Sequence, residues 1–306
     1  MKWQGRERSS NIEDRRSQGG GGLGGGFGGG LGGGGLGGGG FRIPTSGRSG
    51  GIGGIGLIVV VGIICLALGI NPLSLLDGSL SSGGTTFTQS RPLPDAGQDQ
   101  LADFVGVVVK DTETVWTDIF KANGLTYTPP KVVLFTSQTQ SGCGVADANS
   151  GPFYCPNDQK VYIDLSFYDQ LRRQFGAPGD FAQAYVLAHE VGHHVQNLTG
   201  VLPEFNKRRQ TMSEAQANAY SVRVELQADC YAGVWANRIG QENLLDQGDV
   251  EEAITAANAI GDDTLTRGTV SPRNYTHGTS AQRMAWLKRG IQSGNPGDCD
   301  TFSGNI

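Results

Sequence analysis

Apolar residues in the middle of the chain recur at helical and strand spacings. Between residues 99 and 120 they fall at near-helical spacing, which predicts an amphipathic helix that ends near Gly124. Residues 132–135 form a short apolar run typical of a buried strand, and residues 153–155 and 161–163 flank a segment of turn composition, which favours a hairpin. The apolar positions of the first helix are Leu101, Val105, Val108, Val109, Val115 and Trp116.

From Phe167 onward the pattern is helical almost to the C-terminus. A helix is predicted to begin near Asp180, because apolar residues recur there at steps of four, three, four and three and so direct one stripe toward a core. A second long helix is predicted to begin near Ser213. The stripe consists of Ala184, Ala188, Val191, Val195 and Leu198. These elements predict an α+β fold, mainly helical, in which a small, partly antiparallel sheet precedes the helix at Asp180.

The first third of the chain has a different pattern. Residues 19–40 are almost pure glycine, so they have no continuous apolar face to bury and are predicted to be disordered. Residues 52–70 are apolar or glycine throughout, and as a helix they would span about 28 Å, which matches a bilayer core. The predicted organisation is a disordered glycine-rich cytoplasmic arm over 1–50, a transmembrane helix over 51–71, a linker over 72–91 and one folded domain over 92–306.

The charges around the apolar run predict its orientation. The N-terminal side carries seven Lys or Arg residues and three acidic residues, so the positive-inside rule places the N-terminus in the cytoplasm and everything after about Asn71 outside. The chain is thus predicted to be a single-pass protein of the cell (inner) membrane. Two alternatives are a buried core helix, which the all-round apolarity disfavours, and a cleaved signal peptide, which the length of the run disfavours.

Charge and cysteine content narrow the class of protein. Removing the arm's +4 from the overall −5 leaves about −9 for the remainder, and so acidic a domain argues against nucleic-acid partners. Four of the five cysteines fall in the predicted exported part, where an even count indicates two disulfides. We predict the pairs Cys143–Cys155, which closes a short loop, and Cys230–Cys299, which ties the C-terminal tail to the second long helix. A cysteine zinc site would need CxxC spacing, which the chain lacks.

The helix at Asp180 carries the candidate chemistry. Its segment HEVGH places His189 and His193 one turn apart on the same face, the geometry that two ligands need to share one zinc ion. Glu190 projects about 100° away from His189, near enough to act as a base on a water at the metal without being a ligand. An isolated HExxH also occurs by chance on polar helix faces. Here three of the four histidines lie in this cluster, and a matching motif follows downstream.

That second motif, RVELQADC, places Glu225 and Asp229 four residues apart in the second long helix. Zinc sites with two histidines and one glutamate take the carboxylate from a second helix, and an acid one turn further on can orient a ligand histidine. Glu225 is therefore the candidate third ligand, and Asp229 is the candidate acid that orients a ligand histidine. Alternatively, Glu225 pairs with Arg223 or Arg238 at the surface.

Three ordered motifs carry a family resemblance. LAHEVGHHVQNLTG, VELQADCYAGVW and YTHGTSAQRMAWLKRG follow a glycine-rich arm and one apolar span, and they resemble the bacterial membrane proteins of the "putative neutral zinc metallopeptidase" family. The resemblance covers about residues 92–302, and ELQAD is also similar to the Glu-x-x-Ala-Asp of membrane-associated gluzincins in the thermolysin-like clan. It implies a zincin-like domain that binds Zn²⁺, with Glu225 as third ligand and Asp229 behind a ligand histidine.

Two further histidines lie near these motifs. His194 points away from the metal stripe and is predicted to hydrogen-bond a neighbouring loop. His277 stands in a loop before a helix, where it could donate to the oxyanion of a tetrahedral intermediate and so be catalytic. A capping or loop-fixing role is the alternative for His277. Neither a P-loop nor a G-x-S-x-G nucleophile motif is present in the sequence.

Pattern and resemblance together predict a membrane-anchored zinc peptidase that acts on a peptide or protein substrate. Zinc would polarise the scissile carbonyl, while Glu190 takes a proton from water and passes it to the leaving amine. The segment from Phe153 to Tyr162 is the candidate edge strand for β-augmentation by the substrate backbone. The alternatives are a zinc-stabilised, non-hydrolytic membrane scaffold that binds a partner protein, and a surface-anchored binding module in which HEVGH is fortuitous. The sequence specifies no oligomeric state.

Overall fold

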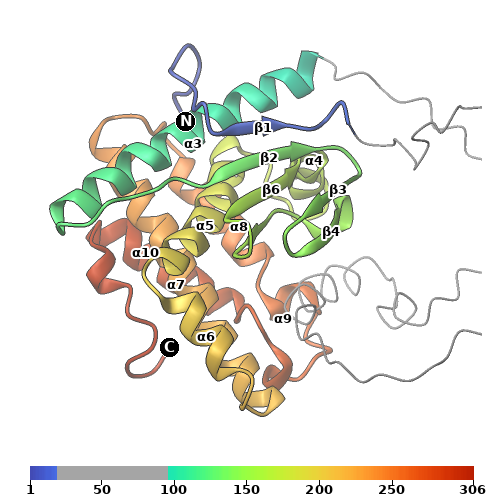
Figure 1. Cartoon of the computed structure of the whole chain (residues 1–306), viewed down its shortest axis with the longest axis vertical. Coiled ribbons are helices and arrows are strands. Elements are labelled where there is room, and N and C mark those ends of the chain that lie inside the picture. The colour runs from blue at the N-terminus through green and yellow to red at the C-terminus, as the bar shows by residue number, and fades with distance from the viewer. Residues whose placement is uncertain (19–95) are drawn as a thin grey trace, which may run out of the picture.

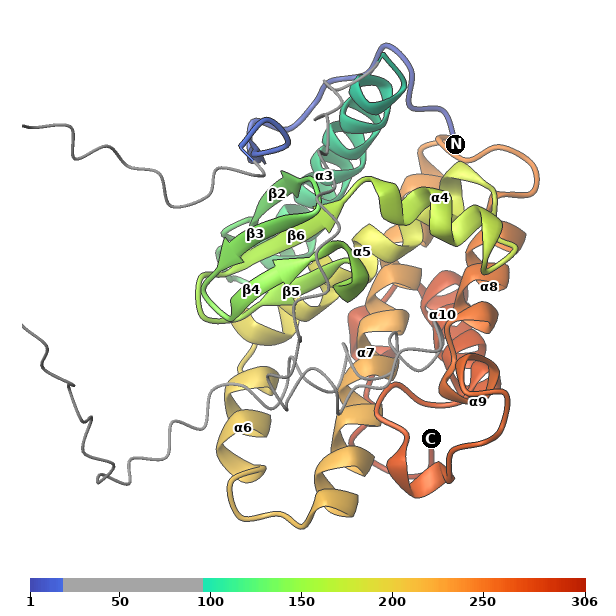
Figure 2. The same cartoon turned by 90° about the vertical axis from the view of Figure 1, so that its right-hand side faces the viewer.

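The computed structural model describes residues 1–18 and 96–306, and the predictions made for residues 19–50, 51–71 and 72–91 lie outside this range. Within it, a four-stranded sheet covers one side of a body of helices, as two perpendicular views show (Figures 1 and 2). The predicted α+β class is therefore confirmed. In the described part of the chain, no helix combines the length and the apolarity needed to cross a membrane.

From α3 onward, the elements follow one another along the chain with short connections. The strands are β1 (Ile12–Asp14), β2 (Lys131–Phe135), β3 (Gln138–Ser141), β4 (Gly144–Asp147), β5 (Phe153–Cys155) and β6 (Lys160–Asp164). The α-helices are α3 (Ala96–Ala122), α4 (Ser166–Arg173), α5 (Asp180–Leu198), α6 (Val201–Arg208), α7 (Glu214–Gln241), α8 (Asp249–Ala259), α9 (Asp262–Leu265) and α10 (Ser280–Ser293). Short 3₁₀ turns are η1 (Ala148–Ser150), η2 (Pro272–Asn274) and η3 (Pro296–Asp298).

The first predicted helix is confirmed as α3. Its apolar stripe is buried, with Val105 and Val108 fully enclosed. Trp116 on the same stripe packs edge-on against Tyr231 of α7, with ring centroids 5.3 Å apart. An amphipathic helix is stabilised chiefly by such burial of its apolar face rather than by intrinsic propensity, so this contact fixes α3 against the helical body.

The sheet has the order β1-β2-β6-β5 and mixes both pairings. Strand β2 runs parallel to β6, with Val132 opposite Val161, whereas β5 and β6 form the predicted antiparallel hairpin, with Tyr154 opposite Val161. Val132 and Val161 are completely buried because helices pack beneath the sheet. Strand β5 ends the sheet on the side of the molecule where it contacts α5.

Helix α5 is the centre of the structure. It contacts α3, α7, α8 and the strands β5 and β6, so most of its residues are buried, well beyond the single predicted stripe. Gly192 allows α7 to approach closely, because a Cβ atom at this position would lie 3.0 Å from the carbonyl oxygen of Ala228. The glycine of HEVGH therefore sets the short distance between the two helices that carry the predicted ligands.

Both predicted disulfides are present. Cys143–Cys155 joins the β3–β4 turn to β5, and Cys230–Cys299 joins α7 to the C-terminal segment. Helix α10 packs tightly beside the second bond, because a Cβ atom at Gly290 would lie 2.0 Å from the carbonyl oxygen of Cys230. Each bridge closes a loop and so restricts the unfolded chain.

The first 18 residues differ from the prediction of a disordered arm over 1–50. They lie on the domain, and β1 pairs in parallel with β2, with Ile12 opposite Val132. The amino group of Met1 lies 2.7 Å from Asp180, the first residue of α5. The segment was missed because the three residues of β1 have no apolar period, and because the strand that pairs with them comes much later in the chain.

Candidate metal centre and active site

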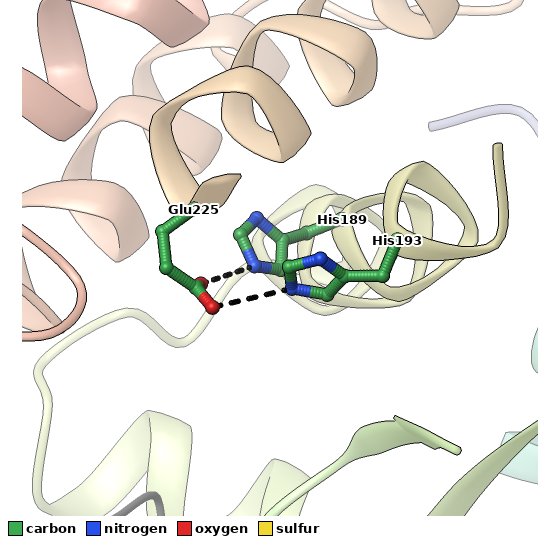
Figure 3. Close-up of side chains that lie close together, drawn as sticks. All are labelled: His189, His193 and Glu225. Carbon is green, nitrogen blue, oxygen red and sulfur yellow. Dashed lines mark hydrogen bonds and ion pairs between the residues drawn. The ribbon is translucent and has the colours of Figure 1, made fainter. Parts of the chain in front are cut away.

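Helices α5 and α7 bring the three predicted ligands together. In Figure 3, His189 and His193 project from α5 toward Glu225 of α7. Glu225 Oε2 lies 3.1 Å from His189 Nε2, and Oε1 lies 3.5 Å from His193 Nε2. All three ligand atoms lie within 4.8 Å of one another. Arg223 and Arg238, the alternative partners of Glu225, donate instead to backbone carbonyl oxygens of the C-terminal segment.

Asp229 fixes the tautomer of His189. Its Oδ1 lies 2.8 Å from His189 Nδ1, and since an ionised carboxylate can only accept, Nδ1 carries the proton. In the neutral imidazole the lone pair is then on Nε2, the atom that faces Glu225. Asp229 is therefore placed as predicted, one turn after Glu225 and behind a ligand histidine.

Gln196 fixes the tautomer of His193. This role of Gln196 was not predicted from the sequence. The Gln196 amide nitrogen donates to the carbonyl oxygen of Val224 at 2.7 Å and to Gln227 at 3.0 Å, so its oxygen faces His193 Nδ1 at 2.9 Å. That oxygen must accept, and His193 Nδ1 must donate. The Nε2 lone pairs of both histidines are thus directed at the same space.

A buried network holds Asp229 in turn. Arg283 of α10 binds it with two bonds, Nε to Oδ2 at 2.8 Å and Nη2 to Oδ1 at 2.9 Å, and the Tyr185 hydroxyl donates to Oδ1 at 2.6 Å. Asp229 and Arg283 are 0% and 3% exposed. Both charges are removed from water, so each side chain would be destabilising without its opposite charge. A bidentate pair also fixes the orientation of the carboxylate as well as its distance from the guanidinium. Arg283 thus positions Asp229, which positions His189.

Opposed charges dominate the electrostatics of the centre. Burial lowers the pKa of His189, but the charges of Asp229 and Glu225 outweigh burial and raise it to about 10. Burial lowers the pKa of His193 as well, and Glu225 reverses the effect and raises it. For Glu225, burial raises the pKa, but the two imidazoles outweigh it and hold the pKa well below the usual range. The arrangement attracts positive charge, either protons or a cation that displaces them.

The donor set fits zinc. Two imidazole nitrogens and one carboxylate oxygen are the protein ligands of a common class of catalytic zinc site, which keeps a fourth position open for water or substrate. Asp180, Asp249 and Glu252 form a second cluster at the other end of α5. That cluster surrounds the Met1 amino group, which lies 2.7 Å from Asp180 and 3.3 Å from Asp249 and already supplies a positive charge.

Glu190 lies between the ligand histidines and the edge of the sheet. Its side chain is buried, and the backbone N–H of Tyr154 in β5 donates to it. Burial raises the pKa of Glu190, and the neighbouring imidazoles offset only part of this rise. A carboxylate whose pKa is raised toward neutrality is a better proton carrier near pH 7 than an ordinary glutamate.

His277 reaches the centre from the loop before α10, and Asp262 holds it there. Asp262 Oδ1 lies 3.1 Å from His277 Nδ1, and Oδ2 accepts the backbone N–H groups of Thr276, His277 and Gly278 at 2.8, 2.8 and 3.0 Å. His277 is close enough to Glu225 for its charge to help lower the pKa of Glu225. The Nε2 atom of His277 remains available for a substrate.

His194 has the structural role that was predicted for it. Its Nε2 donates to the carbonyl oxygen of Thr128 at 2.7 Å, and its Nδ1 lies 3.1 Å from the hydroxyl of Tyr154. Burial lowers the pKa of His194, so the neutral form is favoured. This histidine ties α5 to β5 and to the loop before β2.

The site residues that were not predicted from the sequence share one property: they position another residue and are not candidate metal ligands. Gln196 had a local signal, since it lies one turn after His193 and can reach it. Tyr185 lies one turn before His189 and could have been found in the same way. Asp262 and Arg283 had no such signal, because each is far along the chain from the catalytic helix and only the fold brings it there.

Two histidines of an HExxH helix and a glutamate from a second helix are the ligand arrangement of one class of zinc metallopeptidases, and the geometry of this site matches it. The sequence profile of the family described as "Putative neutral zinc metallopeptidase" matches residues 1–302, and the chain belongs to this family. The zinc and metallopeptidase assignments therefore hold at the level of the family.

Relatives cover the chain to different extents. The uncharacterized protein YpfJ of Escherichia coli (strain K12) is 44% identical over 309 residues, which is 100% of both chains. The uncharacterized protein Rv2575 of Mycobacterium tuberculosis (strain H37Rv) is 44% identical over 205 residues, which covers 62% of this chain and 67% of that protein. No solved structure matches the chain.

Proposed function

We propose that this protein is a zinc-dependent peptidase that holds its metal through His189, His193 and Glu225 and uses Glu190 as its catalytic base. One observation carries the proposal: a buried carboxylate with a raised pKa stands beside a preorganised three-ligand centre and touches the edge strand of a sheet. A purely structural zinc site has four protein ligands and needs no base. Both features favour an enzyme over a zinc-stabilised scaffold.

The residues divide the chemistry among them. Bound zinc would supply a Lewis acid that polarises the scissile carbonyl and makes a water acidic at neutral pH. Glu190 takes a proton from the attacking water and returns it to the leaving amine. His277 stabilises the oxyanion through Nε2, and the contact of Asp262 with Nδ1 fixes the orientation of the ring.

Strand β5 supports the binding of an extended peptide. It is the end strand of the sheet and pairs with β6 on one side. The backbone N–H of Tyr154 points to Glu190, away from the strand that pairs with β5. A substrate that adds to this edge by β-augmentation would therefore run past the catalytic base. This keeps the predicted segment Phe153–Tyr162 as the substrate-binding strand.

The test compares three variants of the purified full chain with the wild type. Glu190→Gln keeps shape and ligands, so we expect one zinc per chain and hydrolysis of a mixed-sequence peptide library reduced by about 10²- to 10⁴-fold. Glu225→Ala removes a ligand and should lose zinc itself. Glu204→Gln changes an exposed glutamate paired with Arg208 on α6 and should change neither quantity.

Cells provide the second readout. Exported peptides are compared by mass spectrometry between cells that carry the wild-type protein and cells that carry Glu190→Gln, and peptides should accumulate or disappear only with the wild type. Identical peptide profiles, together with a zinc-loaded wild type that cleaves nothing in the library, would favour the non-hydrolytic scaffold. Attachment to a membrane through residues 51–71 stays a prediction, and the two disulfides favour an oxidising compartment for the domain.

A further inference from the structure

Residues 1–18 are bound to the domain along their whole length. Four backbone hydrogen bonds from this segment or to it span its length, and all are 2.7 to 2.9 Å long. They are Lys2 N to Leu244 O, Ser9 N to Gly106 O, Val132 N to Asn11 O and Arg15 N to Leu134 O. The last three of these bonds involve β2 and α3, and we call β2 together with the face of α3 that carries Asp103, Gly106, Asp111 and Glu113 the acceptor surface. Bonds at both ends and in the middle of the segment indicate a built interface rather than a chance one.

The acceptor surface is complementary to the segment in charge. Arg6 binds Asp111 through both nitrogens, at 2.6 and 2.8 Å, and Asp111 is 5% exposed. Arg8 binds Asp103, also on α3. Asn11 donates to Glu113 at 2.7 Å. Without the segment, Asp111 would lose the two charge-assisted hydrogen bonds from Arg6 while Glu242 remains near it, so the acidic face of α3 is stabilised by this partner.

Gly106 adds a steric signature. The segment crosses α3 at this residue, where a Cβ atom would lie 3.2 Å from the Cβ of Arg8. A glycine in the interior of a helix costs about 1 kcal/mol relative to alanine, and here it provides room for the crossing chain. The family match includes residues 1–18, since it begins at residue 1. The segment is therefore part of the family's shared sequence as well as of this fold.

We propose that residues 1–18 are an integral part of the catalytic domain and that the two lie on the same side of any membrane the chain meets. One folded body cannot be divided by a bilayer, so a single crossing between residue 18 and residue 96 is incompatible with it. This replaces the predicted orientation, in which the N-terminus is cytoplasmic and the domain is outside.

Under this proposal, the same contacts offer another explanation for the basic residues on which the positive-inside prediction depends. That rule treats basic residues beside an apolar run as a signal of orientation. Within residues 1–18, each of the five basic side chains has an acceptor in the structure. Arg6, Arg8 and Arg16 reach acids of α3 directly. Their charge serves docking, so it carries no independent information on which side of a membrane the segment lies.

The first experiment measures sidedness with a membrane-impermeant maleimide. Ser10→Cys reports on the segment and Asn206→Cys on the domain, because both positions are exposed, each in a full-length Cys65→Ser background that serves as the blank. In sealed vesicles we expect both cysteines to label to the same extent before permeabilisation, and to respond together when the vesicles are opened. Labelling of one before and the other only after permeabilisation would overturn the proposal.

The second experiment tests docking itself with a double-mutant cycle on the full chain. Arg6→Ala and Asp111→Ala should each lower the Tm, and the double variant should melt close to the lower single variant, because both remove one interaction. The exposed pair Arg208 and Glu204 provides the matched cycle, where small and additive shifts are expected. Purely additive shifts at Arg6 and Asp111, or no shift in Arg6→Ala, would show that the segment is not docked.

Discussion

Asp229 and Asp262 are both fully buried, and each binds the Nδ1 atom of a histidine beside the candidate metal centre. Asp229 lies 2.8 Å from His189, and Asp262 lies 3.1 Å from His277. The two pairs come from different regions: the first joins helices α5 and α7, whereas the second joins the first residue of α9 to the loop before α10. The contact is the same, and the proposed tasks of the two Nε2 atoms are opposite.

The difference lies in what else binds each carboxylate. Asp229 already has a full positive charge beside it, since Arg283 binds it with two bonds. Held in this way, Asp229 keeps the proton of His189 on Nδ1 and directs the Nε2 atom at the space that Glu225 faces. Asp262 is bound by three backbone N–H groups, which carry only partial charge. The same carboxylate lies against His277 Nδ1 and orients the ring, whose Nε2 is the proposed donor to an oxyanion.

The comparison teaches that an aspartate–histidine contact does not define a role by itself. The surroundings of the Nε2 atom differ: that of His189 faces Glu225, whereas His277 stands in the loop before α10, where its Nε2 is proposed to meet the substrate. It follows that substitutions in the Asp229 pair should act on zinc affinity, while those in the Asp262 pair should act on turnover.

The largest effect is expected from His189→Ala. The variant leaves one histidine and Glu225 at the centre, so zinc affinity should fall by more than the about 10- to 100-fold that the loss of an outer partner costs. Hydrolysis should be lost with the metal and should not return at micromolar zinc. Competitive titration with a chelator measures the affinity. Retention of tight zinc binding in His189→Ala would show that the ligand set is different.

His277→Ala should spare the metal and slow the reaction. If His277 donates to the oxyanion, kcat should fall by about 10²-fold, with KM and zinc stoichiometry nearly unchanged. Steady-state kinetics on one peptide substrate, run beside metal analysis, separate the two quantities. A loss of zinc or of folded protein in this variant would instead support the loop-fixing role.

Asp229→Asn should act on zinc and on stability together. Zinc affinity should fall by about 10- to 100-fold, because His189 loses the partner that fixes its tautomer. The free energy of unfolding should fall by about 3–5 kcal/mol, because Arg283 is left buried without its counter-charge. The affinity is measured on folded protein at low temperature.

The acid dependence of stability gives a second check on Asp229. Burial raises its pKa, but Arg283 and His189 outweigh burial and lower it from 3.8 to about 2. The folded-state pKa lies below the unfolded value, so this carboxylate stabilises the fold fully above pH 4 and loses its effect as the pH falls toward 2. The stability difference between the wild type and Asp229→Asn should shrink over the same interval. A difference that stays constant from pH 5 to pH 2 would contradict the assignment.

Local patterns in the sequence predicted the parts of the fold that have a period. Helical spacing located α3, α5 and α7, and two short apolar runs around a segment of turn composition located the β5–β6 hairpin. The HEVGH and ELQAD motifs predicted the three residues that meet at the centre. Spacing carries the two histidines, whereas the choice of Glu225 also depended on the HEVGH motif and on the family resemblance.

The parts of the fold and site that were not predicted depend on contacts between segments that are distant in the sequence. Strand β1 has three residues and no period, and it exists only because β2 accepts it. Arg283 and Asp262 act on residues of the centre from other elements, and nothing in their own neighbourhood marks them. The basic N-terminal residues did give a signal, but the opposite charges of α3 explain it better than a membrane does. Charge complementarity between remote segments cannot be inferred until the fold places them side by side.

The smallest effect, and the sharpest test of the comparison, is expected from Asp262→Asn. The amide presents an N–H where Asp262 accepts from the loop or from His277, so His277 should be oriented less firmly while its side chain remains. We expect kcat to fall by about 10-fold, the lower end for an outer partner, with zinc affinity unchanged. Because Asp262 acts through His277, adding Asp262→Asn to His277→Ala should cost almost nothing more. A further fall in kcat of about 10-fold in the double variant, or a drop in zinc affinity in Asp262→Asn alone, would contradict the comparison. It would mean that the Asp229 pair does not act only on the metal and the Asp262 pair only on the substrate.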